Sequence, residues 1–206
     1  MIISMYKLIC VTNRNLCADD FIRQTEKVAA AHPDCIMLRE KDLDEDTYSD
    51  LAEKVIRICN KYDVVFSAHY FYKAVIRLSI RRIHVPLFVL RQMSEKEKRF
   101  FSAIGVSCHS KEDAEEAEKL GASYITAGHI FDTSCKAGLP GRGLDFLNEV
   151  KSSVSIPVYA IGGISADNAG NVINAGADGI CIMSGFMKCS DPERLISKLR
   201  EVMEDG

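Results

Sequence analysis

The sequence predicts an α/β protein that folds as a single (β/α)8 (TIM) barrel spanning residues 1–206. Eight short apolar runs alternate with helical patterns along the whole chain, which is the element content of a compact barrel. Two units also share one layout: "GASYITAG" (121–128) and "GADGICIMSG" (176–185) each have a helix-stopping glycine, a small residue, a strand and a terminal glycine. An open, doubly wound sheet is the alternative.

The apolar runs are predicted to be strands because they are short and rich in Val and Ile. Their nearly continuous apolar character is typical of parallel strands that are buried on both faces. In chain order they cover residues 6–12, 35–40, 64–68, 82–85, 103–108, 123–128, 156–162 and 179–184.

The amphipathic segments between these strands are predicted to be helices. Ser110 with Asp113 three residues later, and Pro192, are signals for a helix start, whereas Gly121 and Gly176 stand where a helix should stop. The predicted helices cover 19–31, 46–62, 94–103, 110–121, 144–153, 165–176 and 191–204, and 69–80 has the weakest helical pattern.

Composition narrows the class of function. The 206 residues are 47% hydrophobic and 27% charged, which suits one soluble domain with a sizeable core. The net charge of −3 predicts no nucleic-acid surface, and no apolar run is long enough to span a membrane. The eight cysteines are scattered without a C-x-x-C pair, which indicates reduced thiols, no structural zinc and a cytoplasmic protein. A small molecule is the expected partner, and self-association is left open.

Polar residues gather where the predicted strands end, which is where the active site of such a barrel is built. They follow strands two, five, six, seven and eight: Arg39, Lys41, Ser107, His109, His129, Gly162, Gly163, Ser184 and Gly185.

Two of these groups predict a phosphate site. Gly162 and Gly163 let backbone amides approach a ligand closely, and Ser184 and Gly185 offer further amides near a helix start. The loops after strands seven and eight often hold phosphate in this fold. The alternative is that these glycines only form tight turns.

Arg39 and Lys41 end an apolar strand in "MLREKDL". By strand alternation both should face the barrel mouth, while Glu40 should point toward the helices. Two cations on one face suit a carboxylate or another anionic group. The alternative is a surface salt-bridge cluster with Glu40 and Asp42.

His129 differs from the other histidines because it follows a strand end and precedes a long polar loop. A neutral imidazole there is suited to accept a proton and return it, although a structural role is the alternative. The other four have simpler interpretations: His32 in an exposed turn, His69 in a loop, His84 in the core and His109 as a helix cap.

Five motifs together resemble the thiamine-phosphate synthase family, a (β/α)8 barrel, over nearly the whole chain: "MLREKDL", "IGVSCHS", "GHIFDTSCKAGLPGRG", "AIGGI" and "GADGICIMSG". Synthases of this family use magnesium to join a pyrimidine diphosphate to a thiazole phosphate. The chain departs from them at several positions. Met37 replaces a glutamine, Ala68 replaces an aspartate that helps to hold magnesium, and His129 follows Gly128 where synthases have Gly-Pro.

The segment "GHIFDTSCKAGLPGRG" is instead similar to the thiazole tautomerase branch of the family, which aromatises an exocyclic-ene carboxythiazole phosphate without a metal or cofactor. The resemblance implies that His129 is the acid/base residue and that Gly162, Gly163, Ser184 and Gly185 hold the phosphate. It implies that Arg39, Lys41 and Lys136 lie near the carboxylate and ring, with Cys135 as a pocket residue. A thiamine-phosphate synthase and a non-catalytic, phosphate-binding regulatory paralogue are the alternatives.

Overall fold

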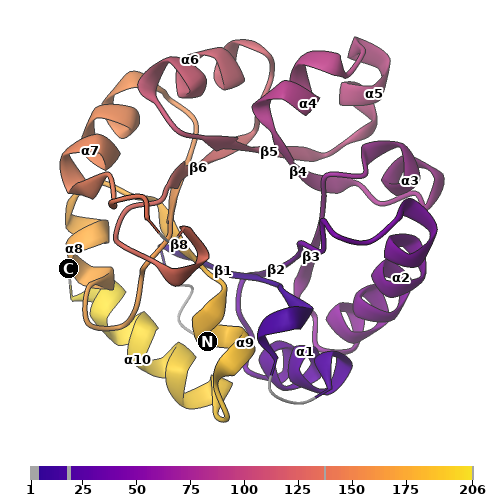
Figure 1. The fold of residues 1–206 in the computed structure, drawn as a ribbon, viewed down its shortest axis with the longest axis horizontal. Helices are drawn as coiled ribbons and strands as arrows, with labels where there is room; N and C mark the ends of the chain where they lie inside the picture. Colours follow the sequence, from indigo (N-terminus) through magenta and orange to yellow (C-terminus); the bar gives the residue numbers. More distant parts are fainter. Residues whose placement is uncertain (1–4, 18–19, 137, 206) are drawn as a thin grey trace.

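A closed barrel of parallel strands forms the centre of the protein (Figure 1). The computed structural model describes residues 5–17, 20–136 and 138–205. In these ranges eight strands pair in sequence order, and β8 pairs with β1 to close the barrel. The predicted (β/α)8 barrel is therefore confirmed, and the open sheet is wrong.

Each predicted strand is present, with ends that differ by a residue or two. The strands are β1 (Lys7–Val11), β2 (Cys35–Leu38), β3 (Val65–His69), β4 (Arg82–Pro86), β5 (Ala103–Cys108), β6 (Tyr124–Gly128), β7 (Val158–Ile161) and β8 (Gly179–Ile182).

The helices lie outside the barrel (Figure 1). They are α1 (Phe21–Ala30), α2 (Glu45–Lys61), α3 (Tyr72–Arg77), α4 (Leu87–Gln92), α5 (Glu95–Phe100), α6 (Lys111–Lys119), α7 (Gly143–Ser153), α8 (Ala169–Asn174), α9 (Ser184–Lys188) and α10 (Pro192–Glu204), with 3-10 turns η1 (Arg14–Leu16) and η2 (Ser134–Lys136). Of these, α4 is absent from the predicted helices and α9 is predicted only as a helix start near Ser184 and Gly185, because each helix is short and closely follows a strand. No helix within the described ranges has the length and apolar character that crossing a membrane requires.

The predicted helix signals are confirmed. The amide of Asp113 donates to Ser110 Oγ at 3.1 Å, which caps α6, and Pro192 is the first residue of α10. Gly121 and Gly176 follow their helices with φ of +91° and +93°, a conformation that glycine adopts without strain.

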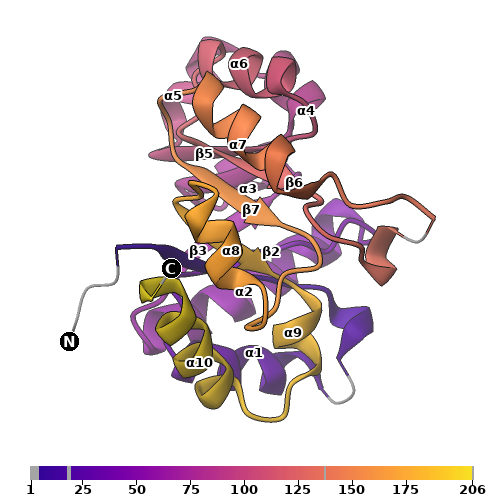
Figure 2. The same ribbon diagram turned by 90° about the vertical axis from the view of Figure 1, so that its left-hand side faces the viewer.

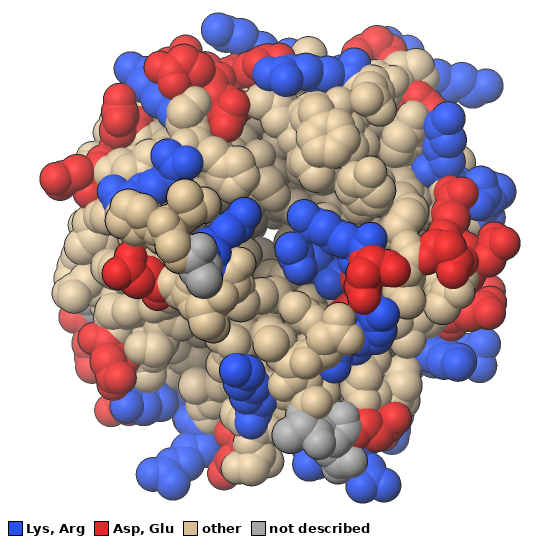
Figure 3. Space-filling model, viewed as in Figure 1, with Lys and Arg blue, Asp and Glu red and all other residues tan. Residues whose placement is uncertain are grey.

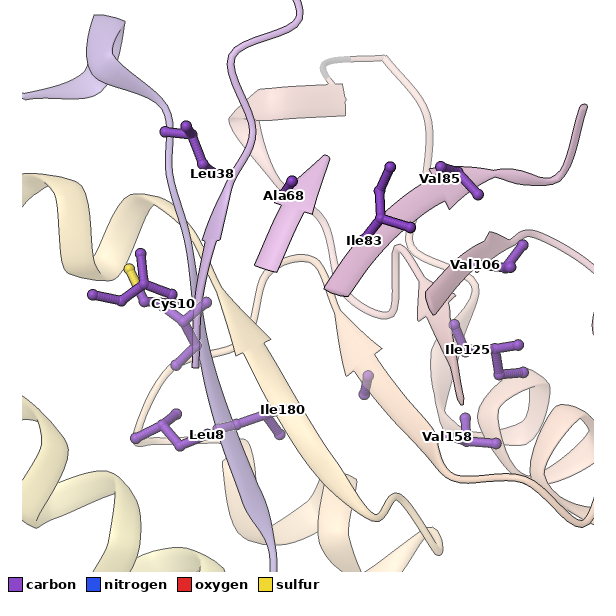
Figure 4. Close-up of a cluster of buried hydrophobic side chains, with 14 of the residues drawn as sticks. Leu8, Cys10, Leu38, Ala68, Ile83, Val85, Val106, Ile125, Val158 and Ile180 are labelled. Atoms are coloured by element: carbon purple, nitrogen blue, oxygen red, sulfur yellow. The ribbon is translucent and has the colours of Figure 1, made fainter. Parts of the chain in front are cut away.

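Alternate residues of the strands face two different environments. Outward side chains pack against the helices as a large apolar cluster, which includes Leu8, Leu38 and Ile83 (Figure 4). Inward side chains form a small apolar cluster around Val11 and Met37. Further inward-facing residues are polar although buried, namely Ser67, His69, His84 and Thr126. Since barrel interiors are usually filled by Val, Ile and Leu, this polar layer indicates a ligand site.

Tyr48 on α2 holds the ends of β2 and β3 together. Its side chain is fully buried, and its hydroxyl donates to the Leu38 carbonyl at 2.9 Å and accepts from the His69 amide at 2.8 Å. Burial raises the pKa of Tyr48, so the phenol keeps the proton that it donates.

Replacing Tyr48 tests this link. Tyr48→Phe leaves a buried donor and a buried acceptor without partners, so we expect a loss of about 2 kcal/mol in the free energy of unfolding, measured by urea denaturation. Tyr62→Phe is the control, because the Tyr62 hydroxyl donates to Glu26 in a partly exposed position; its expected change is below about 0.5 kcal/mol. Equal losses in the two variants would contradict the assignment.

Candidate active site

A cavity of about 540 Å³ opens at the carboxyl ends of the strands. Figure 3 shows the hollow at the barrel centre, with Lys and Arg side chains at its rim. Its lining includes every residue predicted for the site: Arg39, Lys41, His129, Cys135, Lys136, Gly162, Gly163, Ser184 and Gly185. The structure thus brings these residues together, while their individual roles stay predictions.

Arg39 and Lys41 line the cavity, whereas Glu40 is buried on the other side of the strand. The two acidic neighbours pair with Arg14: the guanidinium lies 3.1 Å from Glu40 and 2.7 Å from Asp42. The alternative of a salt-bridge cluster around Arg39 and Lys41 is therefore wrong. Within the described residues, no carboxylate forms an ion pair with either cation.

The cavity carries an excess of positive charge. Burial, followed by the nearby charges of Arg39 and Lys136, lowers the pKa of Lys41. Among the described lining residues, Asp132 supplies the only carboxylate, and its Oδ1 accepts a hydrogen bond from the Gly141 amide at 2.6 Å. Such a lining favours an anionic ligand.

Gly162 and Gly163 have φ of +101° and +68°, so part of their role is to form the turn after β7. They also leave room for the chain that follows β6. A Cβ atom on Gly162 would collide with His129, and one on Gly163 would lie 2.6 Å from the Asp132 carbonyl. The alternative that these glycines form a tight turn is therefore supported by the structure. Phosphate binding by the same glycines remains compatible with it.

Ser184 and Gly185 form the first turn of α9 and line the cavity together with Gly163. Amides in the first turn of a helix have no intrahelical acceptor. They can therefore donate to a ligand, and the binding of phosphate by Ser184 and Gly185 stays a prediction.

His129 leaves the end of β6 and lines the cavity. Its Nε2 lies 3.2 Å from the Leu139 carbonyl. A carbonyl oxygen can only accept, so Nε2 carries the proton of the neutral ring and Nδ1 is left as the acceptor. The connection between β6 and α7 that supplies Leu139 extends beyond the end of the barrel (Figure 2).

The prediction that His69 lies in a loop is wrong, because it is the last residue of β3 and is buried. His84 is a satisfied core residue, as predicted, with its ring nitrogens 2.9 Å from Ser107 Oγ and 3.3 Å from the Tyr124 hydroxyl. Both histidines also line the cavity. The signal that could have found them is strand alternation, which puts His69 on the same face as Ser67.

Of the two remaining histidines, His32 agrees with its prediction, whereas the prediction that His109 caps a helix is wrong, because Ser110 is the residue that caps α6. His32 is exposed, in a turn after α1. The amide of His109 donates to Asp113 at 2.8 Å, next to the start of α6. The ring of His109 also contacts the Gly128 carbonyl at 2.9 Å and lines the cavity.

The donors in the cavity do not fit the magnesium that the family resemblance implies. Magnesium prefers carboxylate and phosphate oxygens, but the described lining offers a single carboxylate, Asp132, among imidazoles, cations and hydroxyl groups. Across the described ranges, no three His, Cys, Asp or Glu side chains lie together as a metal site would require. All eight cysteines are free thiols, and Cys135 is exposed.

The chain is a (β/α)8 barrel protein with a positively charged cavity at the carboxyl ends of its strands. The sequence model of a family described as "Thiamine monophosphate synthase" matches residues 8–186. The chain belongs to this family of thiamine-biosynthesis enzymes.

Relatives over nearly the full length carry the synthase name. The chain is 33% identical to thiamine-phosphate synthase of Clostridium acetobutylicum, covering 93% of each chain. It is 30% identical to that of Pyrococcus abyssi, covering 97% of this chain and 95% of the relative. The solved structure of thiamine phosphate pyrophosphorylase from Pyrococcus furiosus superposes with a TM-score of 0.82 at 27% identity, covering 98% of this chain and 97% of that one. These names favour the synthase alternative over the tautomerase prediction.

Gly163→Ala tests the close packing beside His129. The added methyl group meets the chain that follows β6, so we expect a loss of about 1–3 kcal/mol beyond the cost of the positive φ, measured by urea denaturation. Gly121→Ala is the matched control, since Gly121 has a positive φ with no atom within 4 Å of the new methyl group; its expected loss is about 1 kcal/mol. Equal losses would show that the conformation alone requires glycine.

Proposed function

We propose that the protein is a thiazole tautomerase of thiamine biosynthesis, which aromatises an exocyclic-ene carboxythiazole phosphate. The observation that carries this proposal is the placement of His129. Its ring lines a cationic cavity, its Nε2 is bound to a carbonyl, and its Nδ1 is left to accept a proton.

The reaction moves one proton. In the proposed mechanism, His129 Nδ1 removes the proton from ring carbon C2, and the electrons shift through the ring toward the exocyclic carbon. The imidazolium then returns the proton to that carbon, so the ring becomes aromatic and His129 is regenerated. The Leu139 carbonyl keeps the ring in place and stabilises the imidazolium through its Nε2 proton.

The rest of the cavity supports an anionic substrate. The glycines after β7 and the first turn of α9 are the proposed phosphate site. Arg39 and Lys41, which have no acidic partner within the described residues, would lie near the substrate carboxylate. Lys136 adds positive charge beside the ring, and Cys135 contributes to the wall without acting as a nucleophile.

The second candidate is a thiamine-phosphate synthase. The specific observation in its favour is the name shared by relatives that are 30–33% identical over nearly the whole chain. This function requires magnesium-dependent coupling of the two substrates with release of pyrophosphate.

Turnover without metal tests the proposal. In EDTA, we expect the protein to accelerate the rise of aromatic absorbance from the exocyclic-ene substrate above the spontaneous rate. His129→Ala should lower this rate by about 100-fold or more, because it removes the proton carrier. His32→Asn changes an exposed histidine outside the cavity and should leave the rate unchanged.

Two results would contradict the tautomerase. One is full turnover by His129→Ala, which would remove the mechanism. The other is no acceleration in EDTA, together with pyrophosphate release when magnesium and both synthase substrates are present. That second result would establish the synthase.

A further inference from the structure

His69 is a buried histidine whose hydrogen bonding is incomplete. Its side chain is 3% exposed and lines the cavity. Its Nδ1 is enclosed by protein, and no hydrogen-bond partner reaches it in the described structure. The stacked neighbour His84, with ring centroids 5.7 Å apart, has partners for both nitrogens. His69 therefore differs from a satisfied core histidine.

The enclosure of Nδ1 indicates where the proton of the neutral ring lies. An N–H group buried without an acceptor is rarer and more costly than an unpaired acceptor. The favoured tautomer therefore carries its proton on Nε2, and the ring can use this donor only where it borders the cavity.

Burial keeps His69 neutral, and the positive charges around it add to this effect. Burial, then His84, Arg39 and Lys41, lower its pKa well below the usual value. The register pairs Leu38 with Ala68, so Arg39, which directly follows β2, lies near His69 at the end of β3, and both residues line the cavity. A neutral donor thus stands beside two cations that have no acidic partner in the described residues. A negatively charged hydrogen-bond acceptor on the ligand would accept from His69 and pair with both Arg39 and Lys41.

We propose that His69 is a specificity-determining residue, and that its imidazole N–H binds the ligand carboxylate together with Arg39 and Lys41. This inference rests on the proposed function, because it assumes a thiazole phosphate that bears a carboxylate. It assigns His69 to binding and leaves the proton transfer to His129.

Calorimetric binding of two stable ligands tests this role without turnover. The ligands are the aromatic carboxythiazole phosphate and the same thiazole phosphate without the carboxylate. The unmodified protein should bind the carboxylated ligand more tightly. His69→Ala should reduce that preference by about 10-fold or more, as expected for a hydrogen bond to a charged group. Its affinity for the other ligand should stay within about 2-fold.

Two further variants separate binding from folding. His69→Gln keeps a neutral donor and should restore most of the preference, while His32→Asn should leave both affinities unchanged. Equal weakening of both ligands in His69→Ala and His69→Gln would show a structural role and overturn the inference. An unchanged preference in His69→Ala would also overturn it.

The proposed function fails in a different assay. It fails when EDTA-treated protein shows no His129-dependent turnover, whereas the role of His69 fails when the preference for the carboxylate does not depend on its side chain.

Discussion

The alternation of side chains in a closed barrel is the constraint on which the site depends. Each strand must bury one set of residues against the helices and turn the other set inward. On β2 this places Leu38 outside and Met37 inside, and the residues that follow the strand continue the alternation, with Arg39 lining the cavity and Glu40 buried away from it. Arg14 pairs with Glu40 on the outer side. If Glu40 shared a face with Arg39, the two charges would neutralise one another. The alternation therefore leaves the cavity positively charged.

The second constraint is the space between β7 and the chain that follows β6. Gly162 and Gly163 leave out the side chains that would collide with His129 and Asp132. The connection can then close against the barrel, where the Arg142 amide donates to the His129 carbonyl at 3.0 Å and Leu139 reaches the ring. The glycines thus position the proposed proton carrier as well as the proposed phosphate site. A motif that is usually explained by its ligand alone has a packing reason too.

The sequence predicts the barrel well because its strands are continuous apolar runs separated by capped helices. It fails where the local pattern is ambiguous. The helix α9 begins at Ser184, which is the last residue of an apolar run predicted to be a strand. The helix α4 begins directly after β4. His69 is missed because the predicted strand ends at Ala68 and the aromatic segment that begins at His69 has only a weak helical pattern. The contact between His129 and Leu139 joins residues that are ten positions apart, and no periodicity encodes such a contact.

Sequence identity to the relatives and the chemistry of the cavity give information about different parts of this protein. Identity of about one third over the whole chain shows the family and the barrel, and most of the residues that it compares lie outside the site. The reaction depends on a few side chains at the strand ends. In this chain those positions hold imidazoles and cations, with Asp132 as the single carboxylate among the described lining residues. Under the proposed function, the same barrel carries out a proton transfer in place of metal-assisted coupling. That is why the donors in the cavity weigh more in our proposal than the name of the relatives.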